Sequence, residues 1–195
     1  MAHDVALIHI ASMSNLASAL GWALVDLIEN PAALARVRAG DQEFAGRCAL
    51  ESVRLAQRSI MARTVLSPVT LDDGGTTYEV GPGTTIATLL PLTNRTPSLG
   101  HDTWDPDRWN RSRFIDTDGL GSPELVTSFG HGKHTCPAQP FSIAAMTMTM
   151  TKLVTTFDLA AGWSLYPVPV PAQIGGVARS DEVCPMDYRK LSSRT

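Results

Sequence analysis

Residues 128–146 read SFGHGKHTCPAQPFSIAAM, in which Cys136 follows two glycines and precedes an apolar run of helical character. Pro137 suits the first position of a helix, because its missing N–H would have no partner there. This order predicts that Cys136 lies at a helix N-terminus, where the helix dipole and free backbone N–H groups stabilise an anion. Because the thiolate is the form of cysteine that binds metal, the stretch predicts a thiolate ligand.

Four residues of this stretch have the spacing of the haem-binding loop of the cytochromes P450, and they are Phe129, Gly132, Cys136 and Ala138. In the family that this loop resembles, the cysteine thiolate is the proximal ligand of haem iron and pushes electron density onto it. The resemblance implies haem b as the cofactor, with Cys136 on the iron and His134 on a haem propionate. Gly130 and Gly132 allow a tight loop whose backbone amides approach the sulfur.

A second match is the sequence E-S-V-R from Glu51 to Arg54, whose charged ends share one face of a predicted helix and can pair. Taken alone, such a pair is usually a solvated surface ion pair. Residues 104–109, WDPDRW, are similar to the aromatic-x-Pro-x-Arg-aromatic pattern of the P450 meander segment, which implies Arg108 as a third member. A carboxylate between two guanidinium groups would pin this segment. The resemblance also implies Arg63 on a propionate, with a surface arginine as the alternative.

Three other interpretations of Cys136 stay open on the residues alone. His131, His134 and Cys136 have the short spacing of zinc ligands, although no fourth ligand stands nearby. Cys136 also fits a nucleophile that a histidine activates. The third interpretation is a buried structural cysteine beside a glycine loop.

Length and composition predict one domain over residues 1–195, with enough chain to bury a core. Hydrophobic residues make up 44% of the chain, charged residues 18%, and the net charge is −3, so no basic excess indicates nucleic acid. The three cysteines are widely spaced and odd in number, which favours a reducing compartment over a disulfide framework. We expect a cytoplasmic protein.

Residues 5–25 contain no Asp, Glu, Lys or Arg, and this length is enough for a transmembrane helix. Several polar residues interrupt the run, and the next Lys or Arg is Arg36, so the positive flank of a membrane span is missing. A helix that is apolar nearly all round is also typical of a buried central helix. We therefore expect a buried helix here, and neither a membrane anchor nor a signal peptide.

The expected fold is mainly α with small β-sheets, and its order of elements resembles the C-terminal half of a cytochrome P450. Hydrophobic periodicity and capping residues predict helices over residues 4–29, 32–39, 41–58 and 137–156. Runs rich in Val, Ile and Thr predict strands over residues 65–71, 77–80 and 84–88, and a helical turn is expected at residues 89–94. Residues 96–121 are expected to be coil, and short strands follow Phe157.

The first helix departs from the family. Where the P450 central helix usually has Ala/Gly-Gly-x-Asp/Glu-Thr, this chain has Ala11-Ser-Met-Ser14-Asn15. Ser14 and Asn15 are the candidate catalytic residues at these positions; both can hydrogen-bond a ligand or a water, but neither titrates. The Asn is similar to the branch with sterol hydroxylases and prostacyclin synthase, while the short link between the first helix and Glu51 resembles the soluble bacterial branch.

The resemblance implies three possible functions. The first is a haem-thiolate monooxygenase that oxidises a small apolar substrate with electrons from a ferredoxin or reductase. The second is a haem-thiolate isomerase or dehydratase that does not use O2, suggested by the missing acid–alcohol pair. The third is an inactive fragment with weak or no haem binding, because the family's N-terminal half has no counterpart in these 195 residues. The chain would then be a truncated product or one piece of a larger protein.

Overall fold

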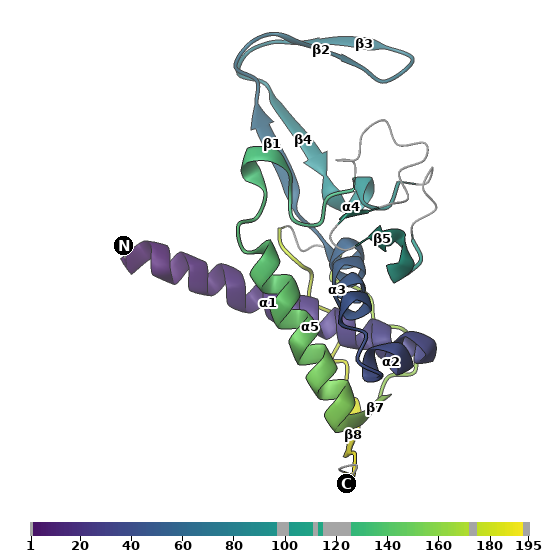
Figure 1. Cartoon of the computed structure of the whole chain (residues 1–195). Coiled ribbons are helices and arrows are strands. Elements are labelled where there is room, and N and C mark those ends of the chain that lie inside the picture. The colour runs from purple at the N-terminus through teal and green to yellow at the C-terminus, as the bar shows by residue number, and fades with distance from the viewer. Residues whose placement is uncertain (1, 97–101, 111–112, 115–125, 172–174, 193–195) are drawn as a thin grey trace.

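The computed structural model describes residues 2–96, 102–110, 113–114, 126–171 and 175–192 (Figure 1). This described part combines helices with small two-stranded antiparallel sheets, so the predicted mainly α fold with small β-sheets is confirmed. Much of the coil predicted at residues 96–121 falls outside the described residues.

Three helices follow one another at the start of the chain: α1 (Ala2–Glu29), α2 (Pro31–Arg38) and α3 (Gln42–Ala56). Asn30 separates the first two, because the residue before a proline is pushed out of the helical region, and Pro31 then begins α2. Gly40, with a φ of 99°, follows α2. Asp41 caps α3 by accepting a hydrogen bond from Phe44 N at 2.9 Å. These helices were predicted, although α3 ends two residues before the predicted end.

Four strands and a helical turn come next: β1 (Ile60–Thr64), β2 (Val69–Asp72), β3 (Thr77–Val80), β4 (Thr85–Leu89) and α4 (Leu90–Thr93). β1 pairs with β4 and β2 pairs with β3, so that the second pair projects from the first as a hairpin (Figure 1). The strand predicted at residues 65–71 is wrong at its start, and β1 was missed. Pro68 separates the two strands, because proline cannot donate to a ladder.

The remaining elements are η2 (Pro106–Arg108), β5 (Trp109–Asn110), β6 (Arg113–Phe114), η4 (Gly132–His134), α5 (Gln139–Thr156), β7 (Phe157–Ala161) and β8 (Met186–Lys190). The prediction that α5 begins at Pro137 is wrong. Ala138 is its N-cap and Pro140 lies in its first turn, while Pro137 belongs to a preceding turn in which Gln139 N donates to Cys136 O at 3.2 Å. Cys136 therefore precedes the helix instead of beginning it.

The core lies where the second half of α1, α3 and α5 meet. Met146, Met150 and Val154 of α5 are buried, and Ile143 and Leu153 pack against the same cluster. This is the predicted apolar stripe of the helix, and its methionines fill the core as expected. The alternation of Met and Thr within α5, which resembles a strand pattern, is overridden by this longer helical period.

The first half of α1 lies outside this core and projects from the molecule (Figure 1). Its large apolar side chains are between 60% and 68% exposed: Val5, Leu7, Ile8, Ile10 and Met13. The expectation of a buried helix is therefore wrong for the start of α1, where these side chains are exposed. Contact with the rest of the fold is present at Asn15, which bonds Val177 N, and at Leu16, which packs against the core. By length and composition, the segment His3–Glu29 could cross a membrane, and 11% of its most apolar window is buried in the fold. A single helix of this kind is weak evidence for a membrane span, because core helices and signal sequences have the same length and composition.

A buried acid, Asp26, joins α1 to two other parts of the chain. Its carboxylate is 2% exposed and accepts hydrogen bonds of 2.5 Å from Ser52 Oγ and from Tyr166 OH. Trp104 Nε1 donates to the same Ser52 Oγ at 3.0 Å. Burial raises the pKa of Asp26 from 3.8 to about 6, and the two hydroxyl donors oppose this rise by stabilising the anion.

This raised pKa makes a prediction about stability. Between pH 3.8 and about 6 the folded chain keeps a proton that the unfolded chain has released. The free energy of unfolding should therefore fall as pH rises through this window, with Asp26 contributing about 3 kcal/mol of the change. In Asp26→Asn the side chain stays neutral, so urea unfolding should show a flatter decrease over the same window.

Glu43→Gln is the matched control, because it removes an exposed acid from α3 and should keep the slope of the parent chain. The assignment fails if Asp26→Asn and the parent chain show the same pH dependence.

Candidate functional site

The backbone closes the loop that carries the cysteine. Cys136 N donates to Phe129 O at 2.8 Å, and between them lies the 3-10 turn η4. Gly130 has a φ of 73°, and a Cβ there would lie 2.9 Å from His134 O, so a side chain would both strain and crowd this position. Gly132 has a φ of 60°. The predicted need for glycine at both positions agrees with this geometry.

The thiol of Cys136 differs in exposure from the buried thiol of Cys48. Cys136 is half-exposed, and no hydrogen bond of its sulfur is found among the described residues. Cys48 is fully buried in the core, and burial raises its pKa well above the usual range of a thiol, so it stays protonated. Of these two, only Cys136 can offer its sulfur to a ligand at the surface of the loop.

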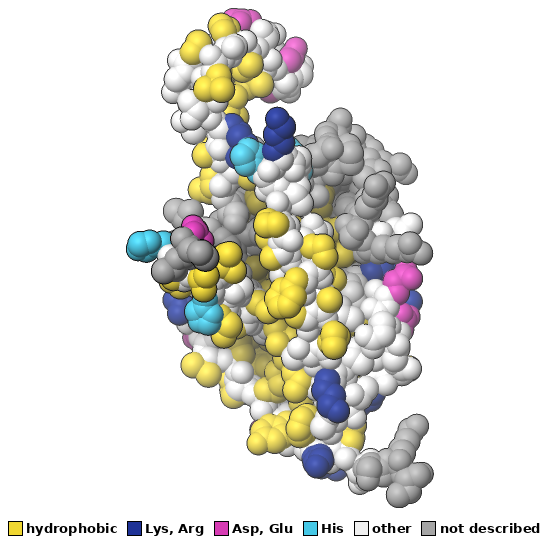
Figure 2. Space-filling model, turned by 60° about the vertical axis from the view of Figure 1, so that its left-hand side comes forward, with side chains coloured by type: hydrophobic (Ala, Val, Ile, Leu, Met, Phe, Trp, Pro, Cys, Tyr) yellow, Lys and Arg dark blue, Asp and Glu magenta, His cyan; other side chains and the backbone are white. Residues whose placement is uncertain are grey.

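Arg63 and His134, the predicted propionate contacts, are both exposed. Arg63 lies on β1 opposite Ile86 of β4, and one guanidinium nitrogen donates to the carbonyl of Ala62 at 2.8 Å. His134 ends η4. Neither forms an ion pair within the described residues. Figure 2 shows a histidine and Lys or Arg side chains grouped where the β2–β3 hairpin leaves the body, an arrangement suited to carboxylates.

Glu51, Arg54 and Arg108 lie together, as the resemblance implies. Glu51 and Arg54 are fully buried on α3 and form a bidentate pair, with Arg54 Nε and Nη2 each 2.8 Å from a different carboxylate oxygen. Arg108 Nη1 lies 3.6 Å from Glu51 Oε1 and also donates to Thr103 O at 2.8 Å. One carboxylate thus faces two guanidinium groups from separate segments of the chain.

Two further donors satisfy the same carboxylate. Trp109 Nε1 donates to Glu51 Oε2 at 2.8 Å, and Asp105 N donates to Glu51 Oε1 at 3.0 Å. Since a buried charge is tolerated only when it is paired and hydrogen-bonded, this network stabilises residues 103–109 against α3.

Sequence reasoning missed two polar residues that connect this network to the cysteine loop. Asn94 is fully buried, and its side chain forms two hydrogen bonds with the backbone of Thr127. Thr127 N donates to Asn94 Oδ1 at 2.9 Å, and Asn94 Nδ2 donates to Thr127 O at 3.1 Å. Arg54 Nη1 donates to the Asn94 carbonyl at 2.6 Å. Gln57 Nε2 donates to Ser128 O at 2.8 Å. A single Asn or Gln gives no sequence signal for such a role, because its partner lies far along the chain.

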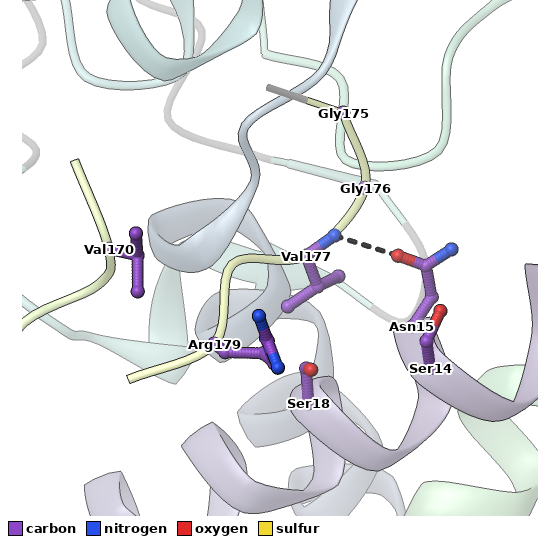
Figure 3. A pocket seen from close by; sticks show the side chains of 8 residues that line it. All are labelled: Ser14, Asn15, Ser18, Val170, Gly175, Gly176, Val177 and Arg179. Atoms are coloured by element: carbon purple, nitrogen blue, oxygen red, sulfur yellow. Dashed lines mark hydrogen bonds between the residues drawn. The ribbon is translucent and has the colours of Figure 1, made fainter. Parts of the chain in front are cut away.

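Ser14 and Asn15 lie apart from this network, beside a pocket of about 490 Å³ between α1 and the C-terminal segment (Figure 3). Ser14 Oγ donates to the carbonyl of Ile10 at 3.2 Å. The amide of Asn15 accepts from Val177 N at 2.9 Å and donates to Ala11 O at 2.8 Å. Cys136 does not line this pocket.

The other interpretations of Cys136 gain no support from the geometry. No group of three His, Cys, Asp or Glu side chains in the described ranges could hold a metal ion, which argues against the zinc interpretation. No hydrogen bond joins the Cys136 sulfur to a histidine within those ranges, and the residue is not buried. An activated nucleophile and a buried structural cysteine are therefore both disfavoured.

Comparison with known proteins decides the family. The family model for Cytochrome P450 matches residues 1–163. The chain belongs to the cytochrome P450 family. A P450 crystal structure from Thermus thermophilus superimposes with a TM-score of 0.72 at 23% identity, covering 92% of this chain and 43% of that one. The resemblance seen in the sequence is confirmed, and the shared fold extends over nearly the whole chain.

The curated P450 relatives are longer than the chain. Ferruginol synthase of Salvia miltiorrhiza is 26% identical over 159 residues, which cover 72% of this chain and 31% of the relative. Sterol 14-demethylase of Arabidopsis thaliana is 30% identical over 118 residues, covering 58% and 24%. The chain spans about a third or less of the length of these relatives.

Haem-thiolate chemistry is general to P450 proteins, so haem is the cofactor that family membership gives this chain. The residues of the loop fit that group. The sulfur of Cys136 has no competing hydrogen bond among the described residues, and Arg63 and His134 are exposed. Gly130 keeps a side chain away from the His134 carbonyl, and Gly132 supplies a second positive φ in the loop. Cys136 would hold the iron, and the exposed Arg63 and His134 would hold the propionates.

The buried carboxylate gives a test of the site's scaffold. Replacing Glu51 by Gln leaves Arg54 charged and buried without its counterion, so the free energy of unfolding should fall by about 3–5 kcal/mol in urea unfolding. The control is Asp158→Asn, which removes a carboxylate that pairs with Arg38 and Arg189 at the surface. That change should cost about 0–1 kcal/mol. Equal effects of the two substitutions would contradict the assignment.

Proposed function

We propose that this chain is the haem-ligating part of a haem-thiolate monooxygenase, in which Cys136 is the proximal ligand of the iron. The half-exposed sulfur in a glycine loop, in the motif position of the family, supports this role best. The haem supplies the activation of dioxygen when it is bound. The thiolate tunes this chemistry by pushing electron density onto the iron.

The other residues of the site position this thiolate. Glu51, Arg54 and Arg108 hold the meander segment against α3. Arg54 also bonds the backbone of Asn94, and the Asn94 side chain bonds Thr127, nine residues before Cys136. Arg63 and His134 would bind the propionates by charge and hydrogen bonding. These contacts would thus hold the cysteine loop in the position that the iron ligand requires.

The substrate we propose is small and apolar, and a ferredoxin or reductase would deliver the electrons. The family's general use of hydrophobic substrates and redox partners supports both. For the location we propose the cytoplasm. The largely exposed stretch of α1, residues 3–14, is only about 18 Å long, shorter than the bilayer core of about 30 Å. It also carries Ser side chains, which favours a protein surface over a lipid one.

The proposal predicts the spectrum of the haem-loaded chain. The reduced carbonyl complex should absorb at the red-shifted position of thiolate ligation, and Cys136→Ala should abolish that band because the ligand is gone. Absorbance titration with haem measures both effects. Cys48→Ala and Cys184→Ala are matched controls that remove the other two thiols and should keep the band.

A thiolate band that persists in Cys136→Ala would contradict the assignment. A parent chain that takes up no haem and aggregates in size-exclusion chromatography would favour the remaining alternative, an inactive fragment. The exposed apolar side chains on the first half of α1 and the longer relatives are the observations behind that alternative.

A second candidate function is isomerisation or dehydration of an oxygenated substrate. It is supported by Ser14 and Asn15, which replace the family's acid and alcohol and have no titratable group between them. Both side chains are engaged with backbone groups, so neither supplies the proton that dioxygen activation requires. A peroxide substrate carries its oxygen already reduced and needs no such delivery.

Turnover of a lipid hydroperoxide by the haem-loaded chain without any reductant separates the two candidates. For the isomerase we expect product formation with no electron donor present, because the substrate supplies both oxygens. The control is Cys136→Ala, which should lose this turnover. Product formation that strictly depends on a reductant and dioxygen would exclude the isomerase.

A further inference from the structure

The segment Gly175–Ala178 passes between α1 and the end of α3. On the α3 side it is held by backbone bonds and by the side chain of Ser59, whose Oγ accepts from Gly176 N at 3.0 Å. Arg58 N donates to Gly176 O at 2.8 Å, and Gly175 N donates to Arg58 O at 2.9 Å. Ala178 N donates to Ala56 O at 2.9 Å. The segment therefore forms an added strand-like edge beside the chain that leaves α3.

On the α1 side the same segment is held by side chains. Asn15 Oδ1 accepts from Val177 N at 2.9 Å, as Figure 3 shows, and Trp22 Nε1 donates to Ala178 O at 2.7 Å. Asn15 Nδ2 donates to Ala11 O at 2.8 Å, which fixes the orientation of the amide with its oxygen toward Val177. Both polar atoms of Asn15 are thus used within the protein.

Gly176 is matched to Asn15. Its φ is 66°, a conformation that favours glycine, and a Cβ at this position would overlap Asn15 Oδ1. The close approach of this backbone to α1 therefore depends on the absence of a side chain at 176. Asn15 and Gly176 form one contact made from two positions that are far apart in the sequence.

We propose that Asn15 is a positioning residue that fixes residues 175–177 as one wall of the pocket beside α1. The pocket is lined on α1 by Ser14, Asn15 and Ser18 and on the other side by this segment. Because the amide of Asn15 is committed to Val177 and the Ser14 hydroxyl donates to Ile10 O, the α1 groups left for a ligand are the hydroxyl of Ser18 and, as an acceptor only, the oxygen of Ser14 one turn away. This positioning role does not depend on haem binding.

Amide hydrogen exchange of the full chain tests this role residue by residue. Asn15→Leu keeps the size of the side chain but removes the acceptor, so the protection of the Val177 amide should fall roughly tenfold while the core amides of α3 and α5 keep theirs. Asn15→Asp keeps an acceptor and should restore protection. That rescue should weaken when the introduced carboxyl is protonated, whereas the parent chain should show no such pH profile.

Ser14→Ala is the matched control, since that hydroxyl bonds only the helix carbonyl of Ile10 and should not alter Val177. Unchanged Val177 protection in Asn15→Leu would overturn the proposal. An equal loss at every amide of the chain would also overturn it, because the effect would then be global.

If Asn15→Leu does not fold, the steric match offers a second measurement. Gly176→Ala should lower the urea midpoint more in the parent chain than in the Asn15→Ala background, where the overlapping oxygen is gone. Equal shifts in the two backgrounds would overturn the proposal.

Discussion

The order of this site depends on one buried carboxylate. Glu51 is fully buried on α3 and is tolerated there because Arg54, Arg108, Trp109 and a backbone amide all face it. Removing a charge pair from water costs several kcal/mol, and these bonds must offset that cost. The result is that an irregular segment, which has little secondary structure of its own, acquires a fixed position against a helix.

This order reaches the cysteine loop through backbone groups. Arg54 bonds the carbonyl of Asn94, whose side chain bonds Thr127, and Gln57 bonds Ser128. These contacts lie immediately before the loop in which Cys136 closes on Phe129. The buried ion-pair network and the cysteine loop are therefore parts of one hydrogen-bonded unit. This unit is attached through α3 to the core that α1, α3 and α5 form.

α1 serves two purposes along its length. Its second half is core, where Leu27 and Trp22 are buried and Asp26 bonds Ser52 and Tyr166. Its first half is apolar and exposed, and it carries Asn15 beside the pocket. The matched P450 structure from Thermus thermophilus is more than twice as long as the region it shares with this chain.

The sequence by itself determined the local features: the caps and prolines that bound α1 to α3, the helical period of α5, and the spacing of the cysteine loop. These features depend on residues within a few positions of one another, so they can be predicted from the order of residues along the chain. The start of α5, the start of β2 after Pro68, the presence of β1 and the exposure of the first half of α1 were decided only by the tertiary structure. So were the contacts of Asn94 with Thr127, 33 residues away, and of Asn15 with Val177, 162 residues away. Such pairs have no sequence signal, because a hydrogen bond requires proximity in space and the chain brings these residues together only when the core has formed.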